Sequence, residues 1–96
     1  RIDAFQSAVH DIQWTKFDEL YDEDISGWIT IFKDFDASWT EPVELLSSLL
    51  GMTDKERLAV ADDFKEATQN WQEAGDEVWF ESRVSVAEEW GRVAVH

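Results

Sequence analysis

Oxygen-bearing side chains recur at alternate positions in the segment from residue 22 to residue 33. Asp22, Asp24 and Ser26 occupy its first, third and fifth positions, Trp28 occupies the seventh, and Thr30 places a hydroxyl at the ninth. In a tight loop, alternate residues can direct their oxygen atoms at one hard cation such as calcium. The spacing therefore predicts a calcium site formed by these five residues.

Three further positions of the same segment bear on that prediction. Gly27 falls at the sixth position, where such a loop turns sharply, and Ile29 falls at the eighth, where an apolar residue anchors it. The twelfth position, which normally carries a bidentate glutamate, is Lys33. Because Lys33 adds a positive charge and no oxygen, we expect weak calcium binding, or a lysine ammonium near Asp22 and Asp24 that partly replaces the ion.

The composition of the chain narrows the choice of partners. Its 96 residues include 22 acidic and 8 basic side chains, which give a formal net charge of −14. Nucleic acid and anionic membranes bind through basic side chains, so neither is expected as a partner. A protein that is basic, or that offers an amphipathic helix, is expected instead. The absence of cysteine and of any long apolar run favours a cytoplasmic protein.

Apolar residues recur at three- and four-residue intervals, which predicts a single, mostly α-helical domain over residues 1–96. The first helix is expected over about 3–21. Thr53 and Glu56 have the spacing of a capping box that opens a long helix. The apolar face of that helix is expected to comprise Leu58, Ala61, Phe64, Thr68 and Trp71. Residues 77–95 fit either a strand hairpin or an irregular loop followed by a helix.

The residues before the acidic segment continue the helical pattern, with Phe17, Leu20 and Tyr21 as its last members. A helix of this kind followed by such a loop resembles the EF-hand of calcium-binding proteins. The arrangement is similar to the first, partly degenerate pair of hands in sarcoplasmic calcium-binding proteins, calexcitin-like proteins and calcium-regulated photoproteins.

The resemblance implies a fold of two paired helix–loop–helix units. The first hand would span about 14–40 and a degenerate second hand about 54–95, with the run from Val84 to Trp90 resembling its closing half. A short two-stranded bridge, in which Ile29 meets Val84, would join the two loops. The implied function is calcium binding, or protein interaction on a decayed hand, without enzymatic activity. A second domain or chain is a further expected partner.

Two other functions are compatible with the sequence. The first is an acidic inhibitor that mimics nucleic acid and blocks a basic partner, which the net charge supports equally well. The second is a small α+β domain of the nuclear-transport-factor-like kind, which would bind a small apolar ligand with Asp22 or Asp24 as candidate base. The sequence shows no phosphate loop and no nucleophile signature. His10 and His96 lie too far apart in sequence to suggest a zinc site.

Overall fold

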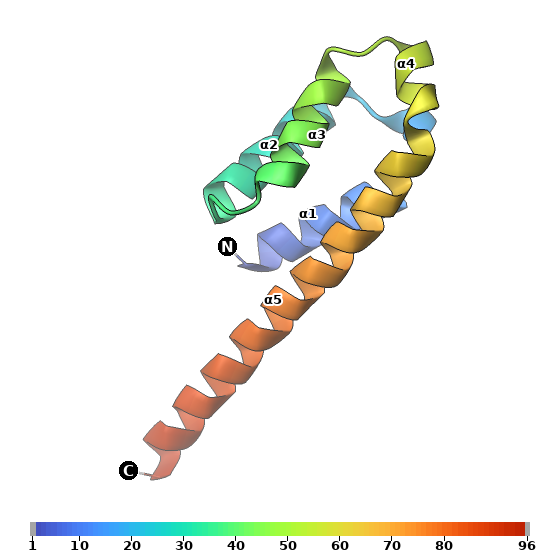
Figure 1. Ribbon diagram of the computed structural model, residues 1–96. Coiled ribbons are helices and arrows are strands. Elements are labelled where there is room, and N and C mark those ends of the chain that lie inside the picture. Colours follow the sequence, from blue (N-terminus) through green and yellow to red (C-terminus); the bar gives the residue numbers. More distant parts are fainter. Residues whose placement is uncertain (1, 96) are drawn as a thin grey trace.

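The fold is all-α over residues 2–95, the part of the chain that this computed structural model describes (Figure 1). The elements in chain order are α1 (Ile2–Trp14), the 3₁₀ turn η1 (Phe17–Glu19), α2 (Asp22–Phe35), α3 (Thr40–Leu50), α4 (Asp54–Ala59) and α5 (Ala61–Val95). The predicted mostly α-helical class is therefore confirmed. The predicted two-stranded bridge and the α+β alternative are wrong, because residues 2–95 contain no strand.

The helices form a small bundle from which one helix projects. α1 packs along the first half of α5, α2 packs on α3, and α2 also contacts α1 (Figure 1). Side-chain contacts join Asp3 to Trp79 and His10 to Asp76, so α1 and α5 run antiparallel. The molecule measures 61 × 21 × 19 Å. The second half of α5 extends beyond the other helices and accounts for this elongation (Figure 1).

α1 buries one stripe of residues and ends earlier than the sequence predicts. Phe5, Ala8, Val9 and Ile12, spaced by three and four residues, form the buried face. The predicted helix over 3–21 is correct as far as Trp14 and wrong beyond it. The Thr15 hydroxyl donates to the Asp11 carbonyl at 2.6 Å, and Lys16 has an extended backbone. Such side-chain competition for helix carbonyls favours an end to the helix.

The predicted loop over residues 22–33 is wrong, because α2 spans the whole segment. The buried face of α2 has helical spacing and consists of Ile25, Trp28, Ile29 and Phe32. The first turn carries three acidic residues, beginning with Asp22, and the last turn carries Lys33. Negative charge at the N-terminus and positive charge at the C-terminus both favour the helix macrodipole. The charges that suggested a cation loop therefore stabilise a helix.

The capping box at Thr53 is confirmed, but it opens a short helix. The Glu56 N–H donates to the Thr53 hydroxyl oxygen, and the Thr53 N–H donates to the Glu56 carboxylate, both at 3.2 Å. α4 then ends, and Val60 departs from helical dihedral angles before α5 begins. The expected long helix is therefore two helices, and Leu58, expected on the buried face, is exposed.

Of the two alternatives for 77–95, the strand hairpin and the irregular loop are wrong and the helix that follows the loop is confirmed, because α5 is one continuous helix. Its buried face begins as expected from the sequence, with Phe64, Thr68 and Trp71. Gly75 continues this face against α1, where an added Cβ would lie 3.5 Å from the Phe5 ring and 3.6 Å from a Val9 methyl group. No proline follows Pro42 in the sequence, so nothing interrupts the helix. The loop of the predicted second hand is consequently helical.

An aromatic cluster centred on Phe32 forms the core. The centroid of its fully buried ring lies 5.6 Å from that of Phe5, 5.6 Å from that of Trp39 and 5.8 Å from that of Trp71. These distances are typical of favourable aromatic pairs. Phe5 belongs to α1 and Trp71 to α5. One ring on α2 therefore holds α1 and the first half of α5 in place.

Hydrogen bonds to Asp76 link α1 to α5 along the line where these two helices meet. Its carboxylate lies 2.9 Å from His10 Nε2 and accepts a hydrogen bond from Gln6 Nε2 at 3.1 Å. The contact with His10, followed by that with Gln6, holds the pKa of Asp76 below its usual range. The seam between α1 and α5 is therefore sensitive to protonation of this carboxylate.

Acidification is expected to weaken that seam. Because the folded-state pKa of Asp76 is depressed, its stabilisation is present above the unfolded pKa and is lost as the pH falls through the folded value. Asp76 is half-exposed, so we expect a loss of only about 0.5 kcal/mol. Urea unfolding of the wild type and of Asp76→Asn, which cannot titrate, would be measured from neutral to acidic pH. The difference between the two proteins should shrink on acidification, and a constant difference would contradict this account.

Candidate functional site

The structure places all five predicted calcium ligands on α2 and does not bring their oxygen atoms together. Successive helical residues are rotated by about 100°, so Asp22 and Asp24 point to different sides of the helix. Trp28 is buried against the core, and the Thr30 hydroxyl donates to the Ser26 carbonyl at 3.1 Å. Among residues 2–95, no group of three or more acidic, histidine or cysteine side chains is arranged to hold a metal ion. These residues do not fit calcium in this conformation, so the site stays a prediction from the sequence.

The backbone conformation at Gly27 differs between a helix and a calcium loop. In the loop this position must turn sharply. In α2 its φ is not positive, and an added Cβ would meet no atom within 4 Å. We therefore expect Gly27→Ala to raise the free energy of unfolding by about 0.5–1 kcal/mol, because alanine loses less backbone entropy in a helix. Urea denaturation measures this change, and a destabilised variant would show that the chain turns at this position.

Arg57 holds the first of the predicted calcium ligands in a structural contact. From α4 it donates to Asp22 Oδ1 at 2.6 Å, to the Leu49 carbonyl at 2.9 Å and to the Leu20 carbonyl at 3.4 Å. The Arg57 side chain is only 12% exposed. Asp22 therefore joins α2 to α4 through a guanidinium group.

The projecting half of α5 carries apolar side chains that the other helices leave exposed. Trp79, Arg83, Val86 and Trp90 are spaced by four, three and four residues and define what we call the α5 stripe. At about 100° per residue these four positions fall on one side of the helix. Trp79 donates its indole N–H to Asp3 at the start of α1, and the Arg83 guanidinium lies 5.1 Å from the Trp79 ring centroid. The stripe therefore begins beside α1 and continues past its end.

Exposure of the α5 stripe increases along the helix. Trp79 is half-buried, whereas Val86 and Trp90 are 44% and 69% exposed. Phe80 is 63% exposed as well, and Val84 lies one turn after it. These last two residues lie on a different side of α5 from the stripe, given the rotation of about 100° per residue. The stripe alone is continuous with the face on which α1 packs.

The projecting half of α5 carries mainly negative charge. Residues 73–91 contain six acidic residues and a single basic residue, Arg83. Arg83 is already paired with Asp3 at 2.7 Å, whereas the acidic side chains at Glu77, Glu81 and Glu88 are exposed on the side of α5 opposite the stripe. An apolar stripe on a helix of net negative charge is complementary to an amphipathic segment with basic side chains.

The sequence left this surface undecided because valines and aromatics alternate within residues 77–95. That alternation fits a strand, whereas Val86, Trp90 and Val93 also fit one face of a helix. The spacing of Trp79, Val86, Trp90 and Val93, which follows a period of three and four residues, is the signal that indicates a helical stripe. The two-residue repeat of a strand and the three- and four-residue repeat of a helix both fit so short a segment. Only the packing of the preceding turns of α5 decides between strand and helix.

Comparison with known proteins adds no relative. No protein-family model matches the sequence, and no curated protein or solved structure is significantly similar to it. The resemblance to EF-hand proteins therefore stays a prediction that rests on the residues alone. Within the described part of the chain, no helix has the length and apolar character needed to cross a membrane.

Proposed function

We propose that the chain is a non-enzymatic helical module that binds a basic, amphipathic segment of a protein partner along the α5 stripe. One observation carries this proposal: the stripe continues the face of α5 on which α1 packs, but Val86 and Trp90 are left exposed there. A partner helix laid end to end with α1 would bury both side chains.

Charge supports the choice of a basic partner. The net charge of −14 and the exposed carboxylates on the projecting half of α5 would repel a second copy of this chain and attract a cationic segment. Tryptophan at the centre of an interface commonly carries a large share of the binding energy. An acidic inhibitor that blocks a basic protein would be one module of this kind. The proposal does not depend on the resemblance to EF-hand proteins.

Binding of a labelled amphipathic peptide would test the proposal. The probe is a fluorescein-labelled peptide of about 14 residues with leucines at heptad spacing and lysines elsewhere. We expect saturable binding by fluorescence anisotropy that weakens as salt is raised, because the charges are exposed. Trp90→Ala should weaken binding by about tenfold or more, since it removes the main apolar anchor.

The matched control is Phe80→Ala, which removes a similarly exposed ring from another side of the same helix. It should change the affinity by less than about twofold, because Phe80 lies outside the stripe. A peptide with glutamate in place of lysine should not bind. Equal losses in Trp90→Ala and Phe80→Ala, or binding of the acidic peptide, would contradict the proposal.

A further inference from the structure

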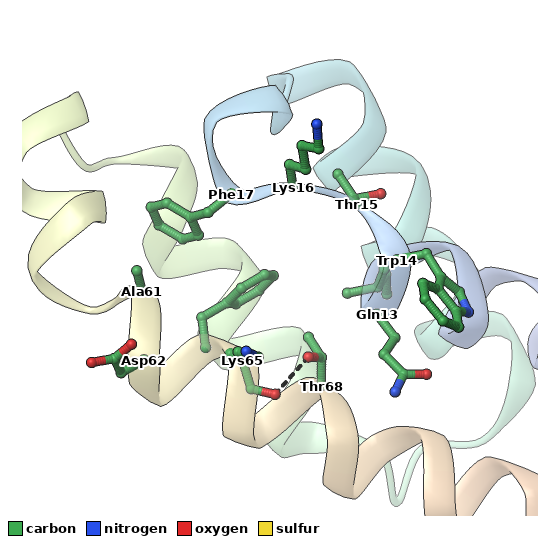
Figure 2. Close-up of a pocket in the computed structure, with 11 residues that line it drawn as sticks. Gln13, Trp14, Thr15, Lys16, Phe17, Ala61, Asp62, Lys65 and Thr68 are labelled. Carbon is green, nitrogen blue, oxygen red and sulfur yellow. Dashed lines mark hydrogen bonds between the residues drawn. The ribbon is translucent and has the colours of Figure 1, made fainter.

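A hollow of about 360 Å³ opens between the end of α1, η1 and the first turns of α5 (Figure 2). Ile12, Phe17 and Phe64 supply apolar surface to its walls. Gln13, Lys16 and Lys65 are the polar residues that can donate hydrogen bonds to an occupant. A hollow of this volume lies at the lower end of the range of small-molecule sites.

The charge around the hollow is the reverse of that in the rest of the chain. Acidic residues outnumber basic ones by 22 to 8 overall, yet two lysines and a single acid, Asp62, line this hollow. Figure 2 shows Lys16 and Lys65 on opposite sides of it. Among residues 2–95, neither lysine forms an ion pair with a carboxylate. Two lysines without an ion-pair partner in the described part of the chain therefore line one hollow of a strongly acidic protein.

Most polar side chains that line the hollow make no hydrogen bond with another side chain of residues 2–95. The Thr68 hydroxyl is used within α5, where it donates to the Lys65 carbonyl at 2.8 Å. The Gln13 side-chain amide makes no hydrogen bond with another described residue, and its Oε1 is buried without a partner. The free hydrogen-bonding groups of the hollow are therefore the Gln13 Oε1 acceptor and the N–H donors of Lys16 and Lys65.

We propose that this hollow binds a small amphipathic anion, an aliphatic chain or ring of about six to eight carbon atoms that carries one carboxylate. The apolar part would lie against the surface of Phe17 and Phe64, whose rings pack on one another in a T-shaped pair with centroids 5.6 Å apart. The carboxylate would lie at the mouth between Lys16 and Lys65. Lys16 points outward in Figure 2, and its flexible stem allows its ammonium to reach the mouth.

Octanoate is the probe that tests this site. The protein would be labelled with ¹⁵N and titrated while the backbone amide signals are recorded by NMR. We expect saturable shifts concentrated in residues 12–17 and 61–68, the two segments that line the hollow. Octanamide, which has the same chain without the charge, should bind at least about fivefold more weakly, because it cannot pair with the lysines.

Charge-removing variants locate the anion. Lys16→Gln and Lys65→Gln should each weaken octanoate binding by about threefold to tenfold. Lys33→Gln, which removes a lysine on α2 that does not line the hollow, should leave the affinity within about twofold. Ala61→Phe places a ring at the wall and should abolish binding, with an unchanged far-UV circular dichroism spectrum as evidence of an intact fold.

Several outcomes would overturn the proposal. These are the absence of saturable shifts, shifts concentrated away from the two lining segments, equal affinity for octanoate and octanamide, or equal losses in Lys33→Gln and Lys65→Gln. None of them concerns the α5 stripe, so this test is independent of the test with the basic peptide.

Discussion

Phe32→Ala is expected to lower the free energy of unfolding by about 3–5 kcal/mol, the range for truncation of a buried aromatic residue. The Phe32 ring is fully buried and pairs with rings from α1, from α5 and from Trp39. Its removal loses apolar burial and leaves a cavity whose walls belong to different helices. A domain of this size has only about 5–15 kcal/mol of stability in total. Urea unfolding followed by circular dichroism at low temperature measures the loss.

Phe80→Ala is the matched control because it deletes the same ring from an exposed position on α5. We expect a change of less than about 0.5 kcal/mol, as is usual for exposed sites. Phe32→Leu retains much of the volume and should cost less than about 1.5 kcal/mol if the core repacks around it. Similar losses in Phe32→Ala and Phe80→Ala would show that Phe32 does not occupy the core.

The apolar spacing of the sequence predicted the helical class and part of the core. Phe5, Val9 and Ile12 recur at helical spacing, and the structure buries all three. The same is true of Phe64 and Trp71. These predictions succeeded because the buried face of a helix is recorded locally, in residues three and four positions apart. The break at Thr15 was not predicted, since it depends on one side-chain hydrogen bond.

The acidic segment was misinterpreted because oxygen ligands and helix caps use the same residue types. Acidic residues at 22–24 fit the start of a calcium loop and equally the first turn of a helix. Ile25 and Trp28, three residues apart, were the signal for a helix, because they extend the spacing of Ile29 and Phe32 backwards by one turn. Lys33 was the second signal, since a cation disfavours a calcium site and suits a helix C-terminus.

The candidate surfaces could not be predicted from the sequence, because both depend on tertiary structure. The α5 stripe continues a face of α5 that α1 covers nearer the start of the helix, and the sequence does not show which helix covers which. The hollow joins two segments, 12–17 and 61–68, that lie more than forty residues apart. Its lysines are unremarkable until the fold places Lys16 opposite Lys65.

Arg57→Met is expected to cost about 2–3 kcal/mol, because it leaves hydrogen-bond acceptors without their charged donor. The Leu49 carbonyl lies in the last turn of α3, where it also accepts from the Met52 N–H at 3.2 Å. Methionine keeps the apolar stem and removes the guanidinium group, so the loss reports on the hydrogen bonds. Arg83→Met is the control: its partner Asp3 is well exposed, so we expect a clearly smaller loss than in Arg57→Met. Equal losses in the two variants would contradict a structural role specific to Arg57.

The contact between Arg57 and Asp22 also permits a direct test of the calcium prediction. Asp22 is 67% exposed, so we expect Asp22→Asn to lower the free energy of unfolding by no more than about 1 kcal/mol. The same substitution should lower it by less when Arg57 is already methionine, because the contact is then absent. A ligand that binds only the folded state raises its stability in proportion to the logarithm of its concentration. If Asp22 is held in a helix by Arg57, millimolar calcium should leave the thermal midpoint of the wild type equal to that in a chelator. A midpoint that rises with calcium in the wild type, and not in Asp22→Asn, would instead show that the segment leaves the helix to bind the ion.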